Sequence, residues 1–228
     1  VTPALTAMHA SDEPQRLRAA FYRGGRYSLW FFGLVAVPAI VFRDELMQLY
    51  LQETFSTYRD AAAVMMVVLL ASLIHCSVRM GMTVAQATGR VRLLTIVSLS
   101  GQLVNVCTTL ILVWGFNMGA FGAGLSTLLV AAVWKPLVMW PILVHQFHLR
   151  TGALLKRVTL PGVVPALVAA TFAEVFRRIL IIDSWTVFAM VTLGTLTVFA
   201  ITVGICMNGS DRQLAGRIAY KIWRKLRR

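Results

Sequence analysis

The fold is decided by residues 185–207, WTVFAMVTLGTLTVFAITVGICM, a run of 23 residues without a charged side chain. A helix needs about 20 apolar residues to cross the hydrocarbon core of a bilayer, so this run predicts a transmembrane helix. Five further apolar runs precede it, at residues 28–42, 61–78, 93–114, 120–144 and 158–173. None of them shows the alternation of a half-buried strand. The sequence therefore predicts an all-α polytopic membrane helix bundle with six transmembrane helices.

Positive charge alternates between the segments that separate these runs. From the first segment to the last, the Lys and Arg counts are 4, 2, 3, 0, 3, 2 and 7. Cytoplasmic loops keep Lys and Arg, so the alternation predicts that both chain ends are cytoplasmic. Of the 22 basic residues, 17 lie in the four predicted cytoplasmic segments. We therefore attribute the net charge of +13 to membrane topology and expect no nucleic-acid partner.

The tail after Met207 has the pattern of a separate helix. Residues 208–210, Asn-Gly-Ser, end the sixth run, and Ser210 or Asp211 is placed to cap a new helix. Apolar residues then recur every four positions, and basic residues form another face: Arg217, Lys221, Arg224 and Arg228. This amphipathic C-terminal helix suits the surface of a membrane that contains anionic lipids. A freely solvated basic tail is the alternative.

Lys135 is the one basic residue inside an apolar run. It lies 15 residues after Ala120, about 22 Å into the membrane at 1.5 Å per residue. Two interpretations stay open. Lys135 faces a polar cavity, where Pro136 would kink the helix. Alternatively, it extends to the cytoplasmic surface, with Trp134 and Trp140 in the interfacial aromatic belt.

Polar side chains recur at helical spacing on the second and third runs. The second run and the segment after it carry Ser72, His75, Arg79, Thr83 and Gln86, and the third carries Ser98, Gln102, Asn105 and Thr109. Such faces either line a wet cavity or join helices by hydrogen bonds. His75 alone is typical of a packing residue, and Arg79 alone of the cytoplasmic interface. The substrate-binding hypothesis takes Lys135, Arg79, Gln102, Asn105 and His75 as the site.

The remaining reactive residues predict no further chemistry. Cys76, Cys107 and Cys206 lie far apart without a Cys-x-x-Cys pair, so we expect no metal, no cofactor and no disulfide. Asp44 and Glu45 are interpreted as a solvated helix end. The fifth run ends with a possible helical ion-pair set, Glu174 with Arg177 and Arg178.

Several short motifs together resemble one transporter family. They are VTPALT at 1–6, AVPA at 36–39, ELMQLY at 45–50, ATGRVR at 87–92, and the glycine hairpin from 115 to 123. The order and spacing of these motifs resemble those of bacterial polysaccharide and O-antigen flippases, which belong to the multidrug/oligosaccharidyl-lipid/polysaccharide exporter superfamily. The resemblance covers residues 1–144 and does not extend to the last two runs. The sequence departs from the family pattern at Met80-Gly81-Met82, which replaces a more aliphatic run.

This resemblance implies the C-terminal half of a 14-span flippase of the bacterial cytoplasmic (inner) membrane. Residues 1–27 would be the end of a truncated helix and a cytoplasmic linker, and 28–144 four helices of the C-terminal lobe. Residues 145–207 would add two C-terminal helices, and 208–228 would be the basic tail. The substrate would be an undecaprenyl-pyrophosphate-linked glycan, moved by alternating access against the missing N-terminal half.

Three other function classes remain. A drug or metabolite antiporter of the same superfamily would be expected to carry an intramembrane Asp or Glu. A glycan polymerase or ligase would need outer loops with catalytic side chains, and these loops are short, so we expect no enzymatic activity. A non-transporting scaffold would recruit partners through the basic tail.

Overall fold

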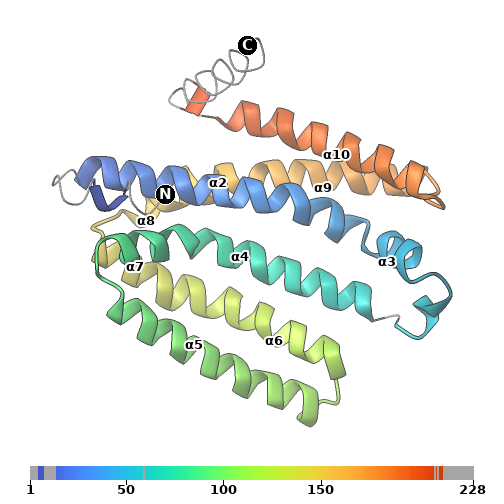
Figure 1. The fold of residues 1–228 in the computed structure, drawn as a ribbon, viewed down its shortest axis with the longest axis horizontal. Coiled ribbons are helices and arrows are strands. Elements are labelled where there is room, and N and C mark those ends of the chain that lie inside the picture. Colours follow the sequence, from blue (N-terminus) through green and yellow to red (C-terminus); the bar gives the residue numbers. More distant parts are fainter. Residues whose placement is uncertain (1–4, 8–13, 59, 208, 210, 213–228) are drawn as a thin grey trace.

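A computed structural model describes residues 5–7, 14–58, 60–207, 209 and 211–212 (Figure 1). This part of the chain is helical and contains no strand. Six stretches are long and apolar enough to cross a membrane: Gln15–Val41, Ala61–Ala87, Arg92–Gly115, Gly119–Gln146, Thr151–Ile179 and Trp185–Cys206. The all-α prediction with six spans is confirmed. The predicted tail helix, with Arg217, Lys221, Arg224 and Arg228, lies outside the described residues.

The spans are built from the following elements. The first is α2 (Pro14–Val41), which leads into α3 (Arg43–Leu51) and the 3-10 turn η1 (Gln52–Ser56). The second is α4 (Ala61–Ala87), and the third is α5 (Arg92–Leu110) with the π-helical η2 (Ile111–Gly115). The fourth joins α6 (Gly119–Trp134), the π-helical η3 (Lys135–Met139) and α7 (Trp140–Gln146). The fifth joins α8 (Thr151–Leu154), the π-helical η4 (Leu155–Thr159) and α9 (Leu160–Ile179), and the sixth is α10 (Trp185–Cys206).

Two helices extend well beyond the apolar runs that predicted them. Helix α2 begins at Pro14 instead of residue 28, and α4 continues to Ala87 instead of residue 78. Both extensions pack into the largest hydrophobic core cluster, where Phe21 of α2 and Val84 of α4 are buried. Burial of one face is enough to hold a helix whose other face carries charge, so hydropathy alone made both helices too short.

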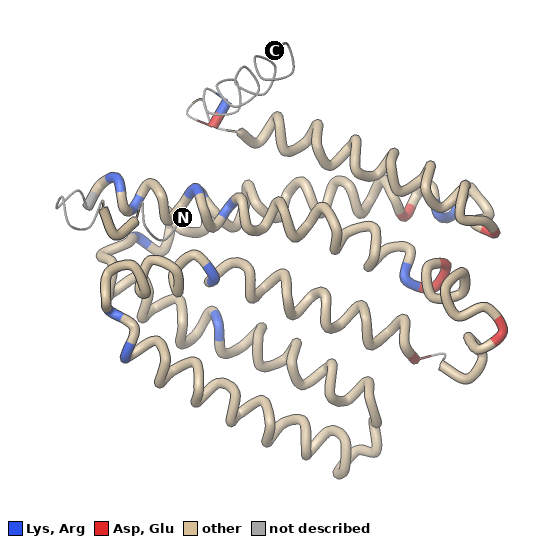
Figure 2. The backbone as a smooth tube through the Cα atoms, viewed as in Figure 1, with Lys and Arg blue, Asp and Glu red and all other residues tan. Residues whose placement is uncertain are grey.

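The helices pack in the order α10, α9, α2, α4, α6, α5, which makes an open row rather than a closed ring (Figure 1). Along the helix axes, most Lys and Arg residues lie toward one end of the bundle and most Asp and Glu residues toward the other (Figure 2). We call these the basic end and the acidic end. The basic end holds the α4–α5 and α7–α8 connections, and the acidic end holds α3 and the α5–α6 and α9–α10 connections. This separation has the pattern that the alternating charge counts predict.

Two prolines attach α9 to α2. Pro161 and Pro165 have no backbone N–H, so neither can donate to the carbonyl four residues earlier, at Arg157 and Pro161. Side chains of α2 donate to those carbonyls instead: Arg26 Nη1 to Arg157 at 3.2 Å, and Trp30 Nε1 to Pro161 at 2.7 Å. Inside a membrane a carbonyl freed by proline must find a partner within the protein, so the prolines become contact points between the helices.

Candidate functional site

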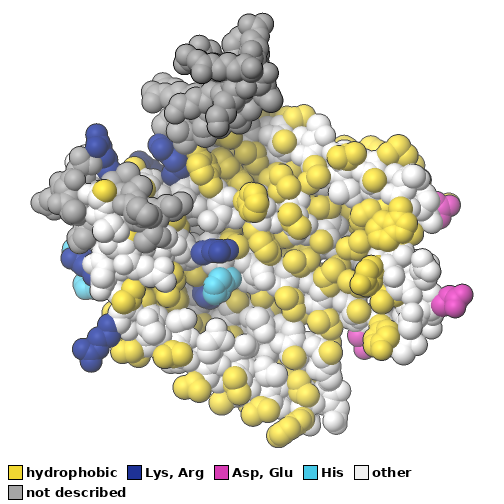
Figure 3. Space-filling view, viewed as in Figure 1, with side chains coloured by type: hydrophobic (Ala, Val, Ile, Leu, Met, Phe, Trp, Pro, Cys, Tyr) yellow, Lys and Arg dark blue, Asp and Glu magenta, His cyan; other side chains and the backbone are white. Residues whose placement is uncertain are grey.

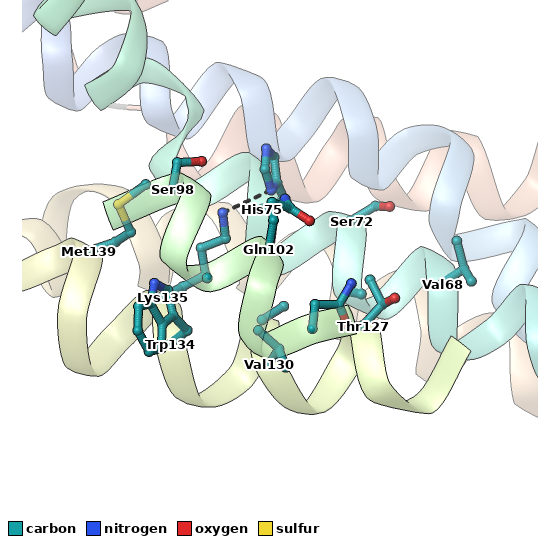
Figure 4. Close-up of a pocket in the computed structure, with 14 residues that line it drawn as sticks. Val68, Ser72, His75, Ser98, Gln102, Thr127, Val130, Trp134, Lys135 and Met139 are labelled. Atoms are coloured by element: carbon teal, nitrogen blue, oxygen red, sulfur yellow. Dashed lines mark hydrogen bonds between the residues drawn. The ribbon is translucent and has the colours of Figure 1, made fainter. Parts of the chain in front are cut away.

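A small polar cavity lies between α4, α5 and α6, at the point where α6 passes into η3. Its volume is about 150 Å³. Its polar lining comes from three helices (Figure 4): Ser72 and His75 of α4, Ser98, Gln102 and Asn105 of α5, and Thr127 and Lys135 of the fourth span. The cavity therefore brings together four of the five residues in the substrate-binding hypothesis.

Lys135 and His75 form the centre of this cavity. Lys135 Nζ lies 2.9 Å from His75 Nδ1, and the two side chains point toward each other across the α4–α6 boundary (Figure 4). A charged ammonium has only donors, so Nδ1 accepts and the imidazole keeps its proton on Nε2. Two ammonium hydrogens remain for another acceptor. In Figure 3, basic and histidine side chains lie together in the middle of a largely uncharged face.

The contact that Lys135 makes favours the cavity-facing interpretation over the interfacial one. Lys135 lies 16 residues from Gly119 and 11 residues from Gln146, the two ends of its span. These separations correspond to about 24 Å and 16 Å. Its ammonium bonds to a residue on the neighbouring helix instead of extending along its own helix to the surface. Lys135 is also the first residue of η3, and such π-helical stretches often occur at functional sites.

Gln102 and Asn105 have different surroundings. Gln102 is exposed on α5 and lines the cavity. Asn105 also lines the cavity, but its Oδ1 accepts a hydrogen bond from the buried Ser126 hydroxyl at 3.1 Å. Thr109 Oγ1 lies 2.5 Å from the same Ser126 oxygen. The α5 polar face therefore both joins α5 to α6 and borders the cavity, and Gln102 is its exposed member.

Arg79 does not line the cavity. It lies four residues after His75 on α4, toward the basic end, and its side chain is exposed. Its position fits a charge at the rim of the site more than a direct ligand.

Trp134 forms a wall of the cavity, a role that the sequence did not predict. Its Nε1 donates to the Val97 carbonyl of α5 at 3.2 Å. The indole occupies the space above Gly101, where a Cβ atom would lie 2.8 Å from Nε1. Trp134 is therefore a packing residue between α5 and the fourth span.

Two clusters of ion pairs outside the cavity join segments far apart in the sequence, and the sequence did not predict them; we call them clasps. At the basic end, the Asp211 clasp consists of the fully buried Asp211 carboxylate, Arg26, Arg23 Nε at 3.3 Å and the Tyr27 hydroxyl at 3.1 Å. At the acidic end, the Arg177 clasp joins Arg177 of α9 to Glu45 at 2.7 Å and Asp44 at 3.2 Å. The predicted helical pairing of Glu174 with Arg177 and Arg178 is confirmed, at 3.5 and 3.0 Å.

Among the described residues, no group of three or more His, Cys, Asp or Glu side chains is arranged to hold a metal ion. The cavity can offer one cation, one imidazole and several amide and hydroxyl groups. Such a set binds an anion or a hydroxyl-rich molecule by charge-assisted and neutral hydrogen bonds.

No family model, characterised protein or solved structure matches this chain. The fold and its apolar spans define a membrane-embedded all-α protein whose candidate site lies at membrane depth.

Proposed function

We propose that this chain is part of a flippase that moves anionic lipid-linked glycans from the cytoplasmic to the periplasmic leaflet of a bacterial inner membrane. The observation that carries the proposal is the lysine at membrane depth, held by His75 with two hydrogens free. Ionisable groups at this depth are costly and usually serve a pathway or a binding site. A pyrophosphate-linked substrate would supply the acceptors that Lys135 lacks.

The open side of the cavity supports transport against a second wall. His75 and Gln102 are both exposed, although their spans lie within the membrane. Lipid chains offer no hydrogen bonds to such groups, so water or another part of a transporter would face them. The cavity of about 150 Å³ is also smaller than the roughly 300–1,000 Å³ of typical ligand sites, so a glycan would need an opposing lobe. This agrees with the motif resemblance, which implies that the chain forms one lobe of a two-lobed transporter. We expect the 228-residue chain alone to transport nothing.

The polar lining favours a flippase over the antiporter alternative. No Asp or Glu is among the described residues that line the cavity, whereas coupling to Na⁺ or H⁺ would be expected to use an intramembrane carboxylate. Glycan hydroxyls would instead find partners in Gln102, Asn105 and Ser98.

The test measures leaflet exchange of labelled lipid-linked oligosaccharide in proteoliposomes that contain the full-length protein. Lys135→Met removes the cation with little change in side-chain length, and Lys135→Arg keeps it. Arg92→Met is the matched control, because Arg92 is an exposed basic residue at the start of α5. A charged hydrogen bond is worth about 1.5–3 kcal/mol, so we expect Lys135→Met to slow exchange roughly tenfold or more.

The controls separate the rival functions. Lys135→Arg and Arg92→Met should keep most of the exchange rate. Exchange at the wild-type rate in Lys135→Met would show that Lys135 does not bind the substrate. A covalently extended glycan would identify an enzyme instead. If neither leaflet exchange nor a covalent product is detected, the result would favour a scaffold.

A further inference from the structure

An apolar groove runs along the other side of α4 from the polar cavity. Its volume is about 530 Å³, and α2, α4, α9 and the fourth span line it. The lining is mainly aliphatic and includes Val37, Leu73, Ile74, Leu128, Val163 and Leu167. No charged side chain is among the described residues that line it. The groove and the polar cavity thus use different faces of α4.

Two polar atoms with no partner lie in the walls of this groove. Trp140 Nε1 and Thr159 Oγ1 are buried and make no hydrogen bond, and both residues line the groove. Ser77, which also lines it, donates to the Ile74 carbonyl of its own helix at 2.7 Å and needs no further partner. A buried unpaired donor is costly, so an acceptor that reached either atom would stabilise the protein.

The depth of these two donors identifies the kind of acceptor. Trp140 lies six residues from Gln146, and Thr159 lies eight residues from Thr151. Along the helix axis these are about 9 and 12 Å from the basic end. The two spans have 28 and 29 residues, so they are about 42–44 Å long and extend about 6 Å beyond each side of a ~30 Å core. For spans centred on the core, both donors lie about 3–6 Å inside the hydrocarbon boundary, close to the level where the ester carbonyls of glycerophospholipids end and the acyl chains begin.

The length of the groove agrees with one leaflet. Along α9 its lining runs from Thr159 to Ala170, a rise of about 16 Å. Half of a ~30 Å core is about 15 Å, the depth of one acyl chain. The exposed Lys156 and Arg157 precede Thr159 at the basic end, on the side where the phosphate of such a lipid would lie.

We propose that this groove binds one acyl chain of an anionic glycerophospholipid from the leaflet at the basic end. The ester carbonyl accepts from Trp140 Nε1 and Thr159 Oγ1, and the chain lies against α2, α4 and α9. The lipid fills the space between the α2–α9 and α4–α6 contacts and so completes the packing of an open helix row. This lipid site is separate from the polar cavity and does not depend on the flippase proposal.

The experiment compares ester-linked and ether-linked phosphatidylglycerol with identical chains. The purified 228-residue chain is incubated in detergent with equal amounts of the two lipids, and the retained lipid is counted by native mass spectrometry. The ether lipid has the same tail and phosphate but no carbonyl. Two hydrogen bonds predict a preference for the ester lipid of roughly tenfold. Equal retention of the two lipids by the wild-type protein would overturn the proposal.

Variants test the location without relying on one substitution. The double variant Trp140→Phe, Thr159→Val should abolish the preference for the ester lipid, although the acyl chains of both lipids should still bind. Ala132→Trp places a large side chain at an exposed position in the groove and should remove both lipids, whereas Ala200→Trp on the exposed face of α10 should not. Equal lipid retention by the two tryptophan variants would refute the groove as the site. Displacement of the lipid by a polyprenyl phosphate, equally in the wild type and the double variant, would assign the groove to an isoprenoid chain instead.

Discussion

The Asp211 clasp should contribute strongly to stability, because both partners of the Asp211–Arg26 ion pair are buried. The Asp211 carboxylate is fully buried and the Arg26 side chain is only 4% exposed. Replacement of Asp211 by leucine would leave the Arg26 guanidinium buried with two weaker contacts, the Arg157 carbonyl at 3.2 Å and the face of Trp30 at 5.3 Å. Removing one partner of a buried ion pair typically costs about 3–5 kcal/mol. Because these two contacts remain, we expect Asp211→Leu to lower the free energy of unfolding by about 3 kcal/mol.

The reverse substitution should cost less. Arg26→Met leaves the Asp211 carboxylate with the Tyr27 hydroxyl at 3.1 Å and with Arg23, whose side chain is 37% exposed and contributes little. We expect a loss of about 2 kcal/mol. The double variant removes both charges and should lose only about 1 kcal/mol, because a buried pair replaced by apolar groups of similar size is often close to neutral. The predicted coupling energy is therefore about 4 kcal/mol, above the roughly 0.5–3 kcal/mol of most contacting residues because both charges are buried.

These energies can be measured by unfolding in mixed micelles at increasing SDS fraction, followed by far-ultraviolet circular dichroism. Two-state curves for the wild type, both single variants and the double variant complete the cycle. Additive losses in the double variant would refute the reasoning, because they would mean that Asp211 and Arg26 act independently. A loss below about 0.5 kcal/mol for Asp211→Leu would refute it as well, because that is the size of a surface substitution.

Two further predictions concern the acidic end and the α4–α6 contact. Arg177→Gln should destabilise by about 2 kcal/mol in the same unfolding assay, because it leaves Glu45, which is 18% exposed at its side chain, without its guanidinium. Arg178→Gln, at a side chain that is 78% exposed, should cost less than about 0.5 kcal/mol, and equal losses in the two variants would contradict the clasp. Gly124→Leu should destabilise by about 1–3 kcal/mol, because even a Cβ atom there would lie 2.7 Å from a Val67 methyl group. Gly204→Leu, where a Cβ would meet nothing within 4 Å, should unfold at the wild-type SDS fraction or above it. A Gly204→Leu variant less stable than Gly124→Leu would contradict the close α4–α6 contact at Gly124.

The number and type of the spans could be predicted because each depends on local composition. A run such as 185–207 must be helical in a membrane, since only a helix satisfies its own backbone hydrogen bonds there. The ends of the helices were harder to place. Residues 14–27, which include four Arg, continue α2 because Phe21 is buried in one core cluster with Val84 of α4 and Leu143 of α7, an arrangement that no local pattern shows.

The candidate site was predictable only in part. The depth of Lys135 and the helical spacing of Ser72 and His75 singled out residues that line the polar cavity. They did not show that Lys135 and His75 meet, since the two lie 60 residues apart in the sequence. Asn105 could not be assigned between cavity and helix contact without the buried Ser126 hydroxyl beside it.

The sequence by itself therefore determined how many helices cross the membrane and which end of each is basic, because hydropathy and charge act residue by residue on the transfer into the bilayer. Only the tertiary structure decided which helices are neighbours. The carbonyls freed by Pro161 and Pro165 needed outside donors, and nothing local specifies that Arg26 and Trp30 of α2 supply them. The same holds for the polar cavity and the apolar groove, which exist because the packing order of the row turns two faces of α4 toward different partners.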